Sequence, residues 1–105
     1  MRERDYQAKL IKKLKKLFPG CIILKNDPEY IQGIPDLLIL HEDKWAMLEV
    51  KISATSNTQP NQQYYVDTFN RMSYAAFINP SNEKDILDAI QRSFATKSGT
   101  RVPQP

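Results

Sequence analysis

Three side chains in the middle of the chain, Asp36, Glu49 and Lys51, have the types and the spacing needed for metal-assisted hydrolysis. Two carboxylates supply the hard oxygen ligands that Mg²⁺ binds, and Mg²⁺ held in this way keeps positions for water and phosphate. A lysine beside them could orient or help activate a water, or neutralise negative charge that develops in the transition state. Because an aspartate followed later by Glu-x-Lys is also common by chance, the argument depends on the elements that carry these residues.

Residues 36–51 have the pattern of a β-hairpin. The segments 36–40 and 45–51 are rich in apolar residues, and the polar segment 41–44 between them has the length of a hairpin turn. Strands joined by so short a connection are antiparallel. The two carboxylates are therefore expected on adjacent strands of one sheet.

The turn determines which residues face each other. Any symmetric turn centred on Glu42-Asp43 places Leu40 opposite Trp45. Four residues further from the turn, Asp36 then lies opposite Glu49 on the same face, with the two β-carbons about 5 Å apart. Directly opposed carboxylates destabilise a sheet, and a divalent cation between them would remove that repulsion.

Lys51 follows Glu49 by two residues and points to the same face, because side chains alternate along a strand. The alternative interpretation of this pair is a surface salt bridge on a half-buried hairpin, which needs no metal. The expected opposition of Asp36 and Glu49 is what favours a metal site.

The hydrophobic pattern predicts three helices and two further strands around the hairpin. The expected segments are a helix over residues 3–18, a strand over 21–25, a loop over 26–33, a helix from Pro60 to about Met72, a strand over 74–79 and a last helix after Asn82. The order αβββαβα predicts an α/β domain over residues 1–95, with a mixed central sheet of about four strands and helices on both faces. Residues 96–105 are rich in Gly, Pro, Ser and Thr and predict a disordered tail.

The first helix begins with two acids on opposite faces. At 3.6 residues per turn, Glu3 falls in line with Leu10, Leu14 and Leu17, whereas Asp5 falls with the lysines. Glu3 is therefore expected to point toward the sheet, where it could serve the site. The alternative is that Glu3 only stabilises the helix N-terminus.

The second helix has an apolar stripe of Tyr65, Val66, Phe69 and Met72, and the same arithmetic puts Gln62 in line with its first three members, while Gln63 turns aside. Gln62 is therefore expected to face the sheet. Both helix starts could reach the same end of the sheet, and with it the carboxylates.

The composition sets limits on the class of protein. The chain has 105 residues, one cysteine and a net charge of +3. No apolar run approaches the length of a membrane span, and the single Cys21 fits a reducing cytoplasm. Residues 1–18 contain seven basic and two acidic side chains, a local charge of +5. This segment indicates either a polyanionic partner or a solvated helix face.

These residues resemble the PD-(D/E)XK nucleases, with the pattern Gly33-Ile34-Pro35-Asp36 followed by Glu49-Val50-Lys51. Within that superfamily, residues 1–90 look most like the stand-alone VRR-NUC (virus-type replication-repair nuclease) domains of phages and bacteria. Two further motifs support the resemblance, an early glutamate at Glu3 and the helix start Pro60-x-Gln62. The resemblance implies the restriction-endonuclease-like αβββαβα core.

The resemblance also implies a site chemistry. It implies a Mg²⁺- or Mn²⁺-dependent phosphodiesterase in which Asp36, Glu49 and the main-chain carbonyl of Val50 hold the metal. Lys51 would position the hydrolytic water, Glu3 would support the metal or a water bound to it, and Gln62 would orient water or phosphate. The segment between Lys51 and Gln62 departs from the family pattern because it lacks its Gly- and Lys-rich character. Three glutamines, at positions 59, 62 and 63, are available there, and which of them serves the site stays open.

The implied substrate is DNA. Stand-alone members of the family tend to be homodimers that cut branched DNA, including four-way (Holliday) junctions, in replication, recombination and repair. Lys25 could contact phosphate or cap a sheet edge, and the loop with Tyr30 and Gln32 could bind DNA because it leads into Asp36. Gln59 is a fourth candidate for a DNA contact. The alternative function is a non-catalytic or partner-dependent DNA-binding subunit on the same fold.

Overall fold

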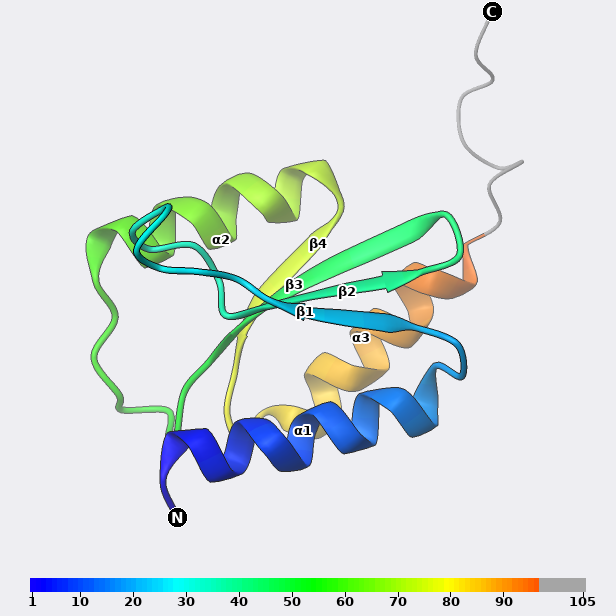
Figure 1. The fold of residues 1–105 in the computed structure, drawn as a ribbon, viewed down its shortest axis with the longest axis horizontal. Coiled ribbons are helices and arrows are strands. Elements are labelled where there is room, and N and C mark those ends of the chain that lie inside the picture. The colour runs from blue at the N-terminus through cyan, green and yellow to red at the C-terminus, as the bar shows by residue number, and fades with distance from the viewer. Residues whose placement is uncertain (97–105) are drawn as a thin grey trace, which may run out of the picture.

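The computed structural model of the chain describes residues 1–96 (Figure 1). Its elements are α1 (Glu3–Leu17), β1 (Ile22–Lys25), β2 (Leu37–His41), β3 (Lys44–Val50), α2 (Pro60–Met72), β4 (Tyr74–Ile78) and α3 (Glu83–Ala95). This order confirms the predicted αβββαβα arrangement and the α/β class. The predicted disordered tail, apart from Thr96, lies outside the described residues.

The four strands form one mixed sheet in the order β1-β2-β3-β4. The pairs β1–β2 and β2–β3 are antiparallel, whereas β3 and β4 are parallel and are joined through α2. Leu40 pairs with Trp45 and Leu37 pairs with Leu48, which is the predicted hairpin register. Glu42 adopts a φ of 58° in the turn, a left-handed conformation that a tight hairpin turn requires.

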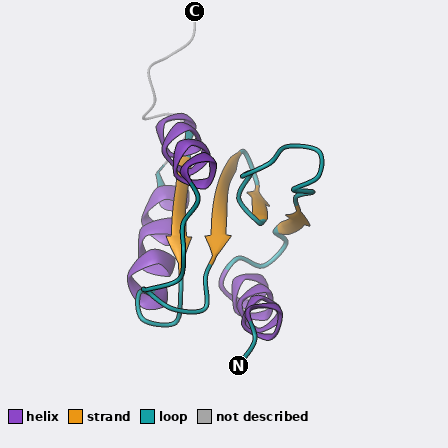
Figure 2. Cartoon of the chain, turned by 90° about the vertical axis from the view of Figure 1, so that its left-hand side faces the viewer, coloured by secondary structure: helices purple, strands orange, loops and turns teal. Residues whose placement is uncertain are grey.

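Helices cover both faces of the sheet, as predicted, with α1 and α3 on one face and α2 on the other (Figure 2). The larger core lies between the sheet and the helix pair α1 and α3, and Leu10, Ile39, Leu48 and Ile90 are fully buried in it. The smaller core lies beneath α2, where Val66 packs with side chains of β3 and β4. Because side chains alternate along a strand, Glu49 points to the α2 face.

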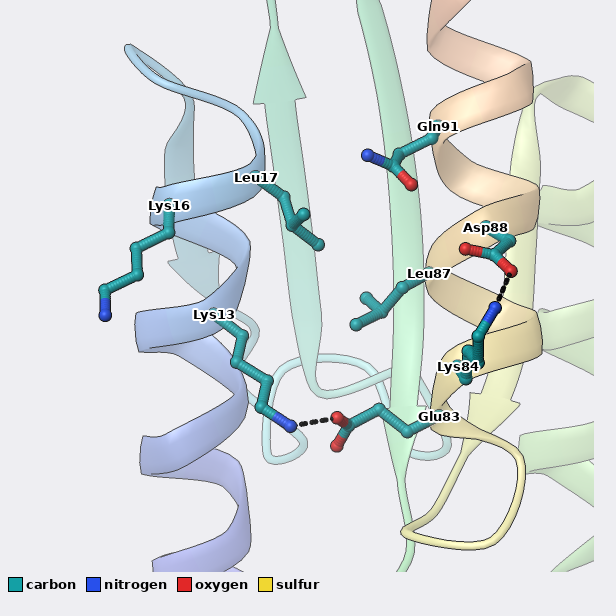
Figure 3. Close-up of a pocket in the computed structure, with 8 residues that line it drawn as sticks. All are labelled: Lys13, Lys16, Leu17, Glu83, Lys84, Leu87, Asp88 and Gln91. Carbon is teal, nitrogen blue, oxygen red and sulfur yellow. Dashed lines mark hydrogen bonds and ion pairs between the residues drawn. The ribbon is translucent and has the colours of Figure 1, made fainter.

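Two predicted apolar stripes are wrong at their C-terminal ends. Leu17 is 38% exposed because the buried stripe of α1 advances by four residues, through Tyr6, Leu10 and Leu14. Leu17 instead lines a pocket between α1 and α3 (Figure 3). Met72 is 66% exposed because it is the last residue of α2, where the chain leaves the helix to enter β4.

Among the helices of residues 1–96, none is long and apolar enough to cross a membrane.

Candidate active site

Asp36 lies directly before β2, and its carboxylate reaches across to β3. Its Oδ2 accepts a hydrogen bond of 2.8 Å from the main-chain N–H of Val50. Two hydrogen bonds from Asn26 hold the segment before β2, one from its N–H to the carbonyl of Asp36 and one from its Nδ2 to the carbonyl of Pro35. The local fold therefore positions this carboxylate beside the end of β3, as the register predicts.

Glu49 is a buried carboxylate near the end of β3, with only 4% of its surface exposed. Its Oε2 accepts a hydrogen bond of 2.9 Å from Nε2 of Gln62 and lies 3.6 Å from Nζ of Lys51. A buried charge is tolerated only when it is paired and hydrogen-bonded, and both partners of Glu49 come from the predicted site.

Lys51 directly follows β3 and is also buried, at 9% exposure. Its Nζ donates hydrogen bonds to Oε1 of Gln62 at 3.0 Å and to the main-chain carbonyl of Asn57 at 2.8 Å. Its own N–H donates to the carbonyl of Ile78, which continues the parallel pairing beyond β3. The two bonds of Nζ thus hold the ammonium group in place beside Glu49.

Gln62 links these groups to the start of α2. Besides its bonds to Glu49 and Lys51, its Oε1 accepts the N–H of Gln59, the N-cap residue of the helix. Gln63 points elsewhere and bonds Asp67 on the exposed side of α2. Of the three glutamines, Gln62 is therefore the one that contacts the predicted site, and Gln59 supports it by capping the helix.

A close contact joins the loop before Asp36 to the start of α2. Gly33 has a φ of +92°, and a β-carbon on it would lie 2.7 Å from Cγ and 2.9 Å from the main-chain carbon of Asn61. Only glycine tolerates both the conformation and the approach. Asn61 precedes Gln62, so this contact sets the distance between the segment that carries Asp36 and the helix that carries Gln62.

The pKa values of both carboxyl groups are raised, and burial is the main cause for each. Burial, followed by the charge of Asp36, raises the pKa of Glu49 to about 7, although Lys51 acts in the opposite direction. Burial also raises the pKa of Asp36, against the lowering effect of the Val50 N–H and of Lys51. The raised pKa values therefore reflect burial first and, for Glu49, the negative charges of Asp36 and Glu3, which Lys51 opposes.

Glu3 belongs electrostatically to this group, whereas Asp5 does not. Burial and the charge of Asp36 raise the pKa of Glu3, while Lys51 lowers it. Asp5 instead forms an exposed ion pair with Arg2 at 3.8 Å. The structure thus brings the start of α1 near the carboxylates, although Glu3 itself is exposed.

The remaining predicted residues lie around this centre. Lys25 is exposed at the end of the edge strand β1, and Tyr30 and Gln32 are exposed on the loop before Asp36. Val50 ends β3, and its N–H bonds Asp36. The roles of these residues in binding DNA or metal stay predictions.

Sequence reasoning missed several residues that hold the site. Asn57 acts through its main-chain carbonyl, which no side-chain pattern reveals. Tyr6 and Lys13 of α1 both donate hydrogen bonds to the carboxylate of Glu83, which ties α1 to the start of α3. The one available signal for Tyr6 was its place in the buried stripe of α1, four residues before Leu10.

The donor set fits a hard divalent cation. Asp36 and Glu49 lie next to each other, and Oδ2 of Asp36 and Oε2 of Glu49 accept hydrogen bonds from Val50 and Gln62. Carboxylate oxygens are ligands of the type that Mg²⁺ or Mn²⁺ prefers. Within residues 1–96, however, no three Asp, Glu, His or Cys side chains come close enough together to hold a metal by themselves. Water or phosphate would complete the coordination.

The chain was compared with protein-family models, with curated proteins and with solved structures, and none of them matches it.

Proposed function

We propose that this protein is a Mg²⁺- or Mn²⁺-dependent endonuclease that hydrolyses phosphodiester bonds in DNA. The observation that carries the proposal is the adjacency of the half-buried carboxylate of Asp36 to the buried carboxylate of Glu49, where burial and then the charge of Asp36 raise the pKa of Glu49 to about 7. A structural protein gains nothing from such a pair, whereas a cation between the two would stabilise both charges.

Each residue then has a separate task. Asp36, Glu49 and the carbonyl of Val50 would hold the metal, which supplies Lewis-acid stabilisation of the phosphate. Lys51 orients the attacking water and neutralises charge near the phosphate, because its ammonium group is fixed beside Glu49.

The remaining groups support this centre. Gln62 holds the amine of Lys51 and the carboxylate of Glu49 in one geometry through its two hydrogen bonds. Glu3 adds negative charge near the metal from the start of α1, in keeping with its raised pKa.

The choice of substrate follows from the charge distribution and from the resemblance to VRR-NUC domains. Residues 1–18 carry a local charge of +5, which suits a polyanion. We propose branched DNA as the preferred substrate and a homodimer as the active form, because two symmetric strand cuts need two sites related by a twofold axis. We also propose that the enzyme acts in the cytoplasm of a bacterial or phage-infected cell, during replication, recombination or repair.

The decisive experiment is cleavage of a labelled four-way junction and of a matched linear duplex with Mg²⁺ or Mn²⁺. We expect paired symmetric nicks in the junction, and we expect Lys51→Ala to reduce cleavage at least 100-fold because it removes the positioned cation. Lys84→Ala, which removes an exposed lysine of α3, is the control and should cleave normally. If wild-type protein cleaves none of the DNAs tested, the proposal that it is a nuclease is refuted.

A second candidate is a DNA-binding subunit that is non-catalytic or needs a partner for cleavage. The observation that favours it is that only two carboxylates, and no third metal-binding side chain, come together within residues 1–96. In that case wild-type protein and Lys51→Ala would bind DNA equally well, and neither would cleave it alone. Cleavage that appears only when a partner protein is added would identify the partner-dependent form.

A further inference from the structure

The loop between β1 and β2, residues 26–35, is held by hydrogen bonds at its base and within its turn. The N–H of Asn26 bonds the carbonyl of Asp36 at 2.9 Å, which closes the loop directly beside the candidate active site. Asp27 organises the turn within it, since its carbonyl accepts the N–H groups of Tyr30 and Ile31 and its Oδ1 accepts the N–H of Glu29. The Gly33–Asn61 contact fixes the far side of the loop against α2.

This ordered loop presents Tyr30 to solvent. The side chain is 85% exposed, the highest value among the large hydrophobic residues in the described part of the chain. Within residues 1–96, its ring forms no aromatic pair and its hydroxyl forms no hydrogen bond, unlike Tyr64 and Tyr65, which pack against each other. An aromatic ring on a fixed backbone loses little entropy on binding, because only two side-chain torsions have to be restrained.

The charge of the loop shows what kind of surface the ring suits. The loop contains Asp27 and Glu29 and no lysine or arginine, and its nearest cation in sequence is Lys25 at its base. A surface that follows a phosphate backbone needs cations. Tyr30 is therefore suited to the face of a base, which is uncharged and stacks on aromatic rings.

The position of the loop limits which base this could be. Tyr30 precedes Asp36 by six residues, so their Cα atoms lie within about 20 Å of each other even for a fully extended chain. At about 3.4 Å per nucleotide along a strand, this distance spans roughly six nucleotides. A base within that distance exposes its face only where stacking is interrupted, as at a branch point, a flap or a single strand.

We propose that Tyr30 stacks on an unpaired or unstacked nucleobase within about six nucleotides of the phosphate at Asp36 and Glu49, and so makes the enzyme select DNA with interrupted stacking. This inference rests on the proposed nuclease function and names the feature of the substrate that the site recognises. The contact is with the base and not with the backbone.

Binding without metal tests the proposal separately from catalysis. Fluorescence anisotropy would compare wild-type protein, Tyr30→Ala and Tyr30→Phe on a four-way junction, a forked duplex and a linear duplex, in the presence of a chelator. We expect Tyr30→Ala to weaken binding to the junction and the fork about 5- to 100-fold, to change linear-duplex binding less than twofold, and to leave the salt dependence unaltered. Tyr30→Phe keeps the ring and should bind like wild-type. Tyr64→Ala, which removes a partly exposed tyrosine of α2, is the control and should also bind normally.

A base analogue would show the stacking directly. The fluorescence of 2-aminopurine, placed at unpaired positions within six nucleotides of the cleavage site, should be quenched by wild-type protein and by Tyr30→Phe but not by Tyr30→Ala. Equal losses on all three DNAs, unchanged affinity of Tyr30→Ala, or failure of Tyr30→Phe to bind like wild-type would each overturn the proposal. Unchanged DNA affinity would point instead to a protein partner for the loop.

The cleavage assay distinguishes failure of this inference from failure of the nuclease proposal. If wild-type protein cleaves DNA and the Tyr30→Ala variant cuts and binds all three DNAs normally, the protein is a nuclease that does not use this contact. A protein that selects unstacked DNA through Tyr30 but cuts no DNA would support the Tyr30 contact and refute the nuclease proposal.

Discussion

Among single residues, Glu49 carries the largest electrostatic strain of the candidate site. Its carboxyl group is buried between Asp36 and the start of α2, and only Lys51 offsets the negative charge around it. The same burial that fits Glu49 to bind a cation therefore makes it an unfavourable charge in the metal-free protein.

Glu49→Gln should stabilise the metal-free protein at high pH. The native pKa is about 7 against an ordinary value of 4.5, so the native carboxyl keeps its proton where the unfolded one has lost it. This contribution to stability is complete below pH 4.5 and is lost as the pH rises through 7. Glutamine stays neutral throughout, so we expect the variant to be about 2–3 kcal/mol more stable than wild-type at pH 8 and equally stable at pH 4.

Urea unfolding followed by circular dichroism, in a chelator, measures this difference at both pH values. Glu29→Gln neutralises an exposed carboxylate of the loop before β2 and should change the free energy of unfolding little at either pH. A Glu49→Gln variant less stable than wild-type at pH 8 would show that the ion pair with Lys51 outweighs the burial of the charge.

Among the elements, the contact between the loop before β2 and the start of α2 determines the geometry of the site. Gly33→Ala should disturb it because the new β-carbon would meet the side chain and main chain of Asn61 and because the φ of +92° is strained for alanine. We expect the variant to lose about 2–3 kcal/mol of stability and to cleave about tenfold more slowly or worse, since Gln62 moves with Asn61.

Gly20→Ala is a matched control for this change. Gly20 has a φ of +87°, but a β-carbon there would have no heavy atom within 4 Å. The control should therefore lose only about 1 kcal/mol from the backbone conformation and should cleave normally. Urea unfolding and the cleavage assay separate the two variants, and equal behaviour would mean that the approach of Asn61 does not matter.

The elements also show how far the sequence could predict the site. The symmetric turn at Glu42-Asp43 predicts the opposition of Asp36 and Glu49, and helical arithmetic predicts that Gln62 rather than Gln63 faces the sheet. These are local relations, which periodicity determines. The bond from Lys51 to the carbonyl of Asn57 and the contact of Gly33 with Asn61 depend on how a loop and a crossover meet in space. No periodicity encodes such contacts.

The same limit explains why the prediction for Leu17 was wrong. Seven residues after Leu10, Leu17 lies only about 20° from it around an ideal helix, so periodicity alone predicts that it is buried. Whether such a residue is buried depends on how closely the neighbouring helix approaches, and between α1 and α3 a pocket lies at this point (Figure 3).

For the whole molecule, metal binding and folding should be coupled, because the unfolded chain cannot hold Asp36 beside Glu49. A metal that binds only the folded state adds about 2.7 kcal/mol at 100 times its dissociation constant. For a chain of 105 residues this raises the melting temperature by roughly 10 °C. We expect this shift with Mg²⁺ or Mn²⁺ in differential scanning fluorimetry, and a larger shift at pH 8 than at pH 5, because protons compete for Glu49.

Asp36→Asn should abolish the shift, whereas Asp88→Asn, which changes a carboxylate of α3 that pairs with Lys84, should keep it. A shift that survives in Asp36→Asn would place the metal elsewhere on the protein. An absent shift in wild-type protein, together with absent cleavage, would leave the DNA-binding subunit as the better interpretation.

The hairpin of β2 and β3 also has a consequence for the order in which the chain folds. Its two strands are adjacent in sequence and joined by a tight turn, so their pairing needs closure of only a short loop and can form within microseconds. The amide of Gln62 reaches Glu49 only after the longer crossover through α2 is complete. Asp36 and Glu49 therefore meet early, before Gln62 reaches Glu49. Because Glu49 loses its proton as the pH rises through neutrality, the two acids then repel each other, and the metal-free chain should fold more slowly.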